Sequence, residues 1–378
     1  MKEKENKKRA SALLPLLPAG IIGILCGLVI TRYMDLPTAE GGGLPSVLLL
    51  FLALIVSLYM QIILHEAGHL ICGLLSGYRF SSFRIGSFIL LKSGGKFLLR
   101  RLTIAGTGGQ CLMRPPVLKE GKIPVRLYNL GGALMNLVLF GLFLALYFLA
   151  AAPLFKTVCL INAAIGLLFA ATNGIPMRMG LIDNDGRNAF SLEKNPDAIL
   201  AFYHQLKVNE MVAERMRLKD MPEEWFTVSE SADQKNAIIA SIEVFACNRL
   251  MDAHKFEEAE ESIRALLSRG GAVDLHKNLL ICDLFYLTLL KGDWQGAGAL
   301  ITKEQKRFMR AMRKFPTVIR TEYLFARFVS KDNAAIAEQS ALWNQCKKQY
   351  PYPSDIQSEQ ELIDLAEKAL AENTNTQS

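Results

Sequence analysis

The sequence predicts a polytopic α-helical membrane protein with about four transmembrane helices, a small membrane-associated β-sheet and a soluble α-helical domain. Three observations predict this fold. The chain of 378 residues is 51% hydrophobic, its first half holds apolar runs long enough to cross a bilayer, and its second half has a helical pattern without such runs. We expect three regions: an N-terminal basic segment with the first span and a loop (1–43), a membrane core (44–190) and a cytoplasmic helical domain (191–378).

The four expected spans are Ala12–Ile30, Leu44–Leu75, Leu127–Ala152 and Leu154–Ile175. A run of about 20 apolar residues is enough to cross the hydrocarbon core. The first run follows a basic N-terminus, as in a signal peptide, but no small-x-small cleavage site closes it. We therefore interpret it as a retained span.

The loop charges orient these spans. The segment Gly77–Arg126 holds ten Lys or Arg residues and a single acid, Glu120. The positive-inside rule places this loop and both chain termini in the cytoplasm of a multi-pass cell-membrane protein. The net charge of +7 comes from the membrane half, so topology and anionic lipid explain it better than a nucleic-acid partner. The seven cysteines include no CxxC pair, and we expect no disulfide framework.

The basic loop carries a hairpin pattern. Phe88–Leu91 and Phe97–Leu99 flank a Lys-Ser-Gly-Gly-Lys turn, and we expect a third strand at Leu102–Ile104. An open edge of such a sheet can take up an extended peptide.

Three segments of the C-terminal half resemble one another. They begin at His254, Gly292 and Lys331, with spacings of 38 and 39 residues, and each places a turn before an amphipathic helix. This is similar to degenerate tetratricopeptide-type helix pairs. The alternative is an ordinary helical domain.

A metal-binding motif lies near the end of the second apolar run. On a helix, His65 and His69 lie on one face and can chelate one zinc ion, with Glu66 beside them as general base. Ionisable side chains are costly in a span and by default indicate function. A catalytic zinc takes a third protein ligand and leaves one position open.

The third ligand is expected after the fourth span. Asp183 and Asp185 follow it, and because spans two and four run in the same direction, their cytoplasmic ends can meet the two histidines. The same Asn-Asp-Gly sequence is also strong turn chemistry, and a tight turn can aim one carboxylate at a metal.

Over about Leu44–Phe190, these motifs resemble the site-2 protease family of intramembrane zinc metalloproteases. His65, Glu66 and His69 match its HExxH motif. Asp185-Gly186 matches the family's zinc aspartate with its following glycine, and Asn173 and Pro176 match the family's Asn-x-x-Pro. Gly108-Gly109 matches the family's Gly-Gly element. Gly132 and Asn136 match the family's Gly-Pro-x-x-Asn, in which Ala133 replaces the proline.

The resemblance implies one Zn2+ per chain, held by His65, His69 and Asp185, and hydrolysis of peptide bonds in membrane-embedded or hydrophobic peptide substrates. The resemblance favours Asp185 over Asp183 as the zinc ligand, because Gly186 follows Asp185. It places Asn136 near the active site, contacting substrate or the oxyanion. The alternative for Asn136 is a polar bond between helices.

Three other functions compete with this interpretation. A membrane-anchored helical-repeat scaffold with a non-catalytic metal site is the main alternative, and the C-terminal domain is in either case a candidate for docking a protein partner. An aspartyl protease using Asp183 and Asp185 leaves the HExxH motif unexplained. A transporter or channel is poorly supported by one ionisable cluster in four spans.

Overall fold

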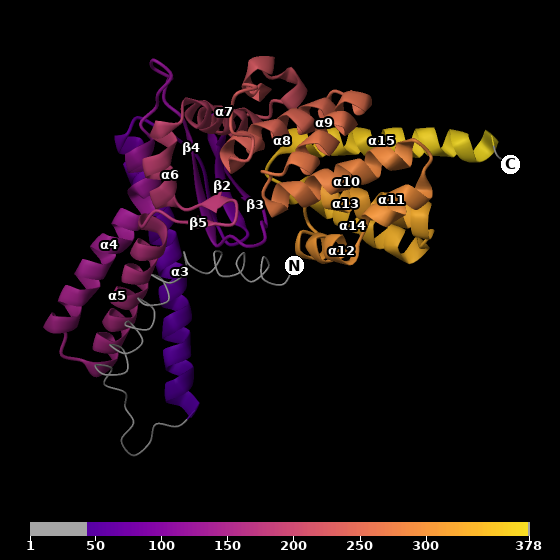
Figure 1. Ribbon diagram of the computed structural model, residues 1–378. Helices are drawn as coiled ribbons and strands as arrows, with labels where there is room; N and C mark the ends of the chain where they lie inside the picture. The colour runs from indigo at the N-terminus through magenta and orange to yellow at the C-terminus, as the bar shows by residue number, and fades with distance from the viewer. Residues whose placement is uncertain (1–43, 377–378) are drawn as a thin grey trace, which may run out of the picture. The chain divides into compact units, whose positions relative to one another are not determined.

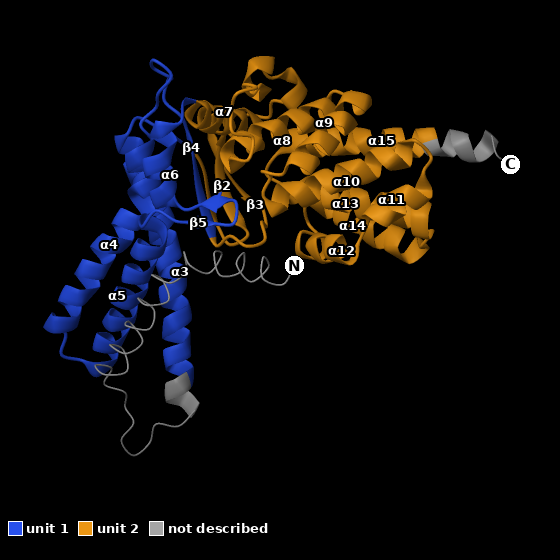
Figure 2. Cartoon of the chain, viewed as in Figure 1, with its two compact units in different colours: residues 1–80, 109–196 blue, residues 81–108, 197–378 orange. Residues whose placement is uncertain are grey.

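The computed structural model describes residues 44–376, so the expected span Ala12–Ile30 lies outside the described residues. The chain forms two compact units (Figure 2): Met1–Phe80 with Gly109–Pro196, and Ser81–Gly108 with Asp197–Ser378. The expected division at 190/191 therefore differs from these units in two ways. The boundary lies at 196/197, and residues 81–108, expected in the membrane core, group with the helical domain.

Most elements of the first unit, which we call the membrane unit, are labelled in Figure 1. Its elements are α3 (Leu44–Leu75), the start of β1 (Arg79–Ile85), β4 (Gly109–Arg114), α4 (Val125–Leu149), α5 (Pro153–Gly174), β5 (Arg178–Met179), β6 (Ile182–Asp183), α6 (Asp185–Ser191) and the 3-10 turn Leu192–Lys194.

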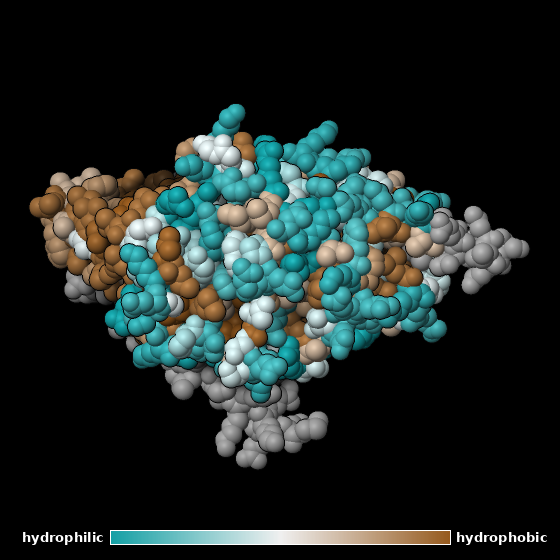
Figure 3. Space-filling view, turned by 90° about the horizontal axis from the view of Figure 1, so that it is seen from above, coloured by the Kyte–Doolittle hydropathy of each residue, from teal (hydrophilic) through white to brown (hydrophobic). Residues whose placement is uncertain are grey.

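Among the described residues of this unit, three helices are long and apolar enough to cross a membrane: Leu48–Leu75, Val125–Leu149 and Pro153–Gly174. They lie where the last three spans were predicted. Many of their large apolar side chains are exposed, and Figure 3 shows hydrophobic residues gathered over part of the surface, in contrast to the hydrophilic remainder. Such an exposed apolar surface is suited to lipid rather than water.

Glycine lets α3 and α4 approach closely. A Cβ atom added at Gly68 would lie 2.3 Å from the carbonyl oxygen of Gly131, and one added at Gly131 would lie 2.5 Å from that of Gly68. Small residues at helix contacts are a common packing device in membranes, because there the hydrophobic effect does not drive helices together. This contact sets α4 against the face of α3 that carries the histidines.

The predicted hairpin is confirmed. In the second unit β2 (Phe88–Ser93) pairs with β3 (Lys96–Arg101) and with β1, both antiparallel, and Ser93 is paired with Lys96 across the turn. Gly94 and Gly95 have φ values of 55° and 76°, as a two-residue type I′ turn requires.

The third strand expected at Leu102–Ile104 is wrong: residues 102–104 form no strand, and the strand that joins the hairpin is β1. Leu102 donates one last backbone hydrogen bond to Ser87, and its side chain and that of Ile104 then pack into a cluster with the C-terminal helices. Burial against helices, rather than strand pairing, accounts for the apolar pattern there.

The rest of the second unit is helical. It contains α7 (Pro196–Ala213), α8 (Ala237–Asp252), α9 (Phe256–Arg269), α10 (Asp274–Leu290), α11 (Trp294–Leu300), α12 (Lys303–Ala311), α13 (Pro316–Leu324) with a π-helical continuation (Phe325–Ser330), α14 (Asn333–Gln349), α15 (Pro353–Thr376) and two 3-10 turns, Leu218–Asp220 and Glu223–Phe226.

The three similar segments each begin at a turn between two helices. His254, Gly292 and Lys331 all have positive φ, at 57°, 79° and 52°. They separate α8 from α9, α10 from α11 and the end of α13 from α14, and the helices of each pair are in contact. The sequence similarity thus marks the left-handed residue that ends one helix and starts its partner. Assignment to the tetratricopeptide class stays a prediction.

A buried charge cluster ties α10, α13 and α15 together. Arg320 is 1% exposed and forms ion pairs with Asp283 at 2.6 Å and Glu359 at 2.8 Å. Next to it on α15, burial and the nearby carboxylates Glu359 and Asp252 raise the pKa of Asp355 to about 7.

The raised pKa of Asp355 predicts a stability that falls as pH increases. Between about pH 4 and 7 the folded unit keeps a proton on Asp355 that the unfolded chain has released. The free energy of unfolding is therefore highest at the acid end of this range and falls as the pH rises to about 7. We expect Asp355→Asn to remove this slope and to stabilise the unit by about 2 kcal/mol at pH 8.

Thermal unfolding at pH 5 and pH 8, followed by tryptophan fluorescence, measures this effect. Trp225, Trp294 and Trp343 all lie in the second unit, so the signal reports on it alone. The matched control is Asp364→Asn, an exposed position on the same helix. Equal pH slopes for wild type and Asp355→Asn would contradict the prediction.

Candidate metal centre

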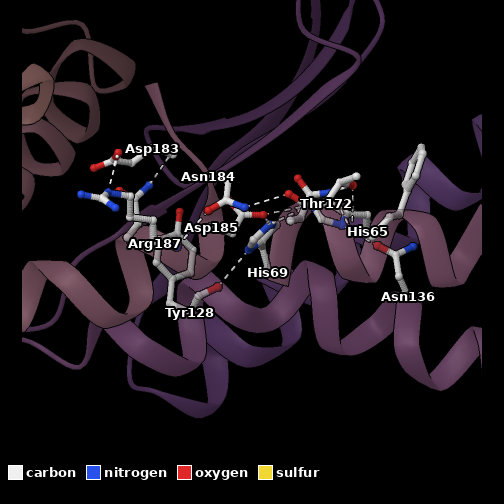
Figure 4. A network of polar contacts seen from close by, with 12 residues as sticks. His65, His69, Tyr128, Asn136, Thr172, Asp183, Asn184, Asp185 and Arg187 are labelled. Carbon is white, nitrogen blue, oxygen red and sulfur yellow. Dashed lines mark hydrogen bonds and ion pairs between the residues drawn. The ribbon is translucent and has the colours of Figure 1, made fainter. Parts of the chain in front are cut away.

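The structure brings His65, His69 and Asp185 together. The two imidazole Nε2 atoms lie 3.2 Å apart, and each lies 3.3 Å from Oδ2 of Asp185. The histidines come from the same face of α3, and the carboxylate comes from the first residue of α6 (Figure 4). Among the residues that the structure describes, these three form a cluster that could hold a metal ion.

The spacing of these three atoms fits a small tetrahedral cation. Zinc bonds to nitrogen and oxygen are about 2.0–2.1 Å long, so two ligands on a tetrahedron are about 3.3–3.4 Å apart. The observed separations of 3.2, 3.3 and 3.3 Å match that edge. Two nitrogens and one carboxylate oxygen are also a donor set that zinc prefers.

Hydrogen bonds at the far side of each ring fix the tautomers. Nδ1 of His69 lies 2.9 Å from the backbone oxygen of Tyr128, which can only accept, so Nδ1 carries the proton. Nδ1 of His65 lies 2.6 Å from Oδ1 of Asn136, which is likewise an acceptor. Both Nε2 lone pairs are therefore directed at the cluster, as in metal-binding histidines generally.

A buried polar chain holds Asn136 in this orientation. Its Nδ2 donates to Oε1 of Gln61 at 2.8 Å, and the Nε2 of Gln61 donates to the backbone oxygen of Asn162 at 3.1 Å. Asn162 in turn donates to Ser57. The α3 members Ser57, Gln61, His65 and His69 recur every fourth residue, which places them on one stripe of the helix.

Asn184 fixes the turn that delivers Asp185. Its side chain caps α6 by accepting from the backbone of Arg187 and also accepts from Met177, while its amide donates to the carbonyl oxygens of Thr172 and Ile175. The turn is thus fastened to the end of α5. Gly186 is required for this packing, because an added Cβ would lie 2.1 Å from the carbonyl oxygen of Gly174.

Asp183 is engaged elsewhere. It forms ion pairs with Arg178 at 2.5 Å and Arg187 at 3.0 Å, and Figure 4 shows it beside Arg187, separate from the histidines. Burial alone raises the pKa of Asp185, but its hydrogen bonds to His65 and His69 outweigh burial and hold that pKa below its ordinary value. The geometry therefore favours Asp185 over Asp183 as the third ligand.

Two glycines leave room beside the cluster. A Cβ atom added at Gly132 would lie 2.5 Å from Nε2 of His65 and 2.6 Å from Nε2 of His69. One added at Gly109 would lie 2.7 Å from Oε1 of Glu66. These spaces allow both imidazole nitrogens and the Glu66 carboxylate to be used, so the chain's own residues fit a bound metal.

Gly132→Ala is expected to abolish metal binding, because its methyl group would collide with both donor nitrogens. The matched control is Gly141→Ala on the same helix, where an added Cβ meets nothing within 4 Å. Zinc content of the two detergent-purified variants measures the difference. Full metal occupancy in Gly132→Ala would show that the space beside Gly132 is not part of the centre.

Sequence reasoning missed three residues of this site. Gln61 carried a usable signal, because it is a polar residue one turn before His65 in an apolar run. The local sequence marks Asn184 only as a turn residue, although its side chain bonds to four backbone groups. Tyr128 contributes its backbone oxygen, which accepts a hydrogen bond from His69. No side-chain pattern in the sequence can reveal such a role.

Fold and site together define a multi-span helical membrane protein with a candidate His–His–Asp metal centre. The family model of peptidase family M50 matches residues 53–350. The chain therefore belongs to peptidase family M50, the site-2 protease family, whose members are intramembrane metalloproteases. Comparison with curated proteins and with solved structures gave no match.

Proposed function

We propose that the protein is a zinc metalloendopeptidase of the site-2 type, which hydrolyses peptide bonds in membrane-embedded or hydrophobic peptide segments. The observation that carries this proposal is the triangle of two Nε2 atoms and one carboxylate oxygen with the edges of a tetrahedral zinc site. The HExxH sequence adds Glu66 to the same turn of α3. His65, His69 and Asp185 would hold one Zn2+ per chain.

Zinc bound there would polarise the scissile carbonyl and acidify a water molecule. Glu66 takes the proton of that water and delivers it to the leaving amine nitrogen. The hydrogen bonds to Asn136 and Tyr128 keep the imidazoles in the tautomer that leaves Nε2 available. The side chains of His65 and His69 are 11% exposed and that of Asp185 is 27% exposed, and this partial burial strengthens each of these electrostatic contacts.

The substrate segment must be extended for its backbone to reach the catalytic groups. Strand β3 is the outer strand of the β1–β2–β3 meander, and the side chains of Phe88, Leu90 and Leu99 on this hairpin are exposed. An apolar peptide that adds to this edge would be held extended by main-chain hydrogen bonds. We further propose that the termini are cytoplasmic and that the helical domain docks a protein partner.

For Asn136 we propose a positioning role. It is fully buried, its Oδ1 faces His65 and its Nδ2 donates to Gln61. This geometry supports the alternative of a polar contact between helices, with the added effect of setting the tautomer of a ligand. Direct contact with substrate stays an untested prediction.

Zinc analysis separates the two aspartates. We expect about one zinc ion per chain in the purified wild type, as for a three-ligand catalytic site, with loss in Asp185→Ala and retention in Asp183→Ala. Both changes remove one carboxylate from the same loop, so each serves as control for the other. Wild-type protein that takes up no zinc after reconstitution would overturn the assignment of the centre.

Glu66→Gln tests catalysis apart from metal binding. The variant is expected to keep its zinc and to lose activity by about 10²–10⁴-fold, as for removal of a general base. Activity is measured by gel after reconstitution with a panel of single-span membrane proteins whose spans contain helix-breaking residues. If wild type and Glu66→Gln treat the whole panel alike, the non-catalytic scaffold becomes the better account.

Asn136→Ala tests the positioning role. Loss of a hydrogen bond behind a metal-binding histidine typically weakens metal binding about 10–100-fold. Asn136→Asp, which keeps an oxygen acceptor for His65, is expected to recover most of the affinity. A substrate-contact role would instead leave zinc affinity unchanged in Asn136→Ala while raising KM.

A further inference from the structure

The carboxyl end of β3 opens onto a pocket that the metal centre does not involve. The pocket has a volume of about 90 Å3, and every residue that lines it belongs to the second unit. One water molecule needs about 15 Å3 of such space, so the pocket can take a small terminal group with a short side chain but not a long acyl chain. Its lining consists of Ser87, Arg101, Leu102, Thr103, Lys314, Ile319, Leu342, Gln345, Cys346, Gln349 and Tyr350.

The charge of the pocket selects for an anion. Arg101 and Lys314 line it, and no acidic residue does. Within residues 44–376 neither cation forms an ion pair; the guanidinium of Arg101 lies 5.1 Å from the ring centroid of Phe88 instead. That contact orients Arg101 without neutralising it. A carboxylate placed here would receive charge-assisted hydrogen bonds.

The floor of the pocket is apolar and its rim carries amide groups. Leu102, Ile319 and Cys346 are buried beneath it. The side-chain amides of Gln345 and Gln349, exposed on α14, can both donate and accept. A ligand with a carboxylate, an apolar side chain and backbone amide groups satisfies all three features, and the last residue of a peptide has this chemistry.

The walls of the pocket are built before any ligand arrives. Leu102 and Ile319 belong to one apolar cluster with Cys346 and Tyr350. The thiol of Cys346 lies 3.7 Å from the backbone oxygen of Lys314 and links α14 to the segment before α13. A preformed site of this kind loses little entropy on binding.

The position of the pocket matches the direction of a strand. Arg101 is the last residue of β3, and no described strand pairs with the outer edge of β3. A peptide that runs parallel to β3 along this edge reaches Arg101 with its carboxyl terminus. We propose that the pocket binds the free C-terminal carboxylate of an extended apolar peptide. This proposal stands on the pocket and the free edge of β3 and does not depend on the metal centre.

The test uses full-length Glu66→Gln protein in detergent, so that no peptide is cut. The probe is a fluorescein-labelled hexapeptide of alternating threonine and valine ending in leucine, with either a free carboxylate or a C-terminal amide. We expect fluorescence anisotropy to show binding of the free acid and at least about tenfold weaker binding of the amide, since a charged hydrogen bond is lost.

Matched substitutions locate the binding. Arg101→Gln and Lys314→Gln should each weaken binding of the free-acid peptide about tenfold or more. Their controls, Arg100→Gln and Arg313→Gln, remove the same charge from the adjacent residue, and neither residue lines the pocket. Tryptophan fluorescence verifies that each variant is folded.

Three results would overturn the proposal: equal binding of acid and amide, no binding of either, or equal losses in the control variants. Displacement of the probe by octanoate but not by the unlabelled free-acid peptide would also overturn it, because the ligand would then be a fatty acid. Proteolysis is not part of the measurement, so loss of the proposed function and loss of this site give separate outcomes.

Discussion

The packing of the membrane unit depends on one constraint: two imidazoles in an apolar helix must find hydrogen-bond partners. His65 and His69 would be costly in a span without them. The structure supplies a side-chain oxygen from Asn136 and a backbone oxygen from Tyr128, both on α4. These partners reach the rings because Gly68 and Gly131 let α3 and α4 touch. The same hydrogen bonds that satisfy the imidazoles direct their Nε2 atoms to one point. One arrangement of α3 and α4 therefore meets both the hydrogen-bonding requirement and the geometry of the candidate metal centre.

The third donor, the carboxylate of Asp185, is positioned by a turn rather than by helix packing. α5 ends, the chain makes the short β5–β6 hairpin, and Asn184 bonds the turn back to the end of α5. Arg178 and Arg187 hold Asp183, which leaves Asp185 to meet the histidines. Two neighbouring carboxylates of the same type thus acquire different surroundings, one in an ion-pair network and one facing two imidazoles. This division of roles resembles the general pattern in which environment rather than residue type decides function at a site.

The second unit combines a hairpin encoded between the spans with the helical domain encoded after them. The hairpin of residues 88–101, encoded between the spans, packs through Ile89 and Leu102 into one core with α13, α14 and α15. The helical domain therefore includes a strand edge and the pocket beside it. Because both arise from one apolar core, the edge is held by the domain that also carries the three helix pairs.

The sequence by itself determined the spans that the structure describes, the hairpin with its two-glycine turn and the histidine pair of the candidate metal centre. Each of these has a local signal: run length, left-handed glycines and the four-residue spacing of a helix. It also offered both Asp183 and Asp185 and could not rank them by local physics. The family resemblance favoured Asp185, and the tertiary structure places Asp185 beside the histidines and Asp183 beside two arginines. Tertiary structure also groups residues 81–108 with the helical unit and makes Leu102 a core residue instead of a strand residue. Those outcomes depend on contacts between segments far apart in the chain, such as Asn136 with Gln61 and Leu102 with Ile319, which no local pattern encodes.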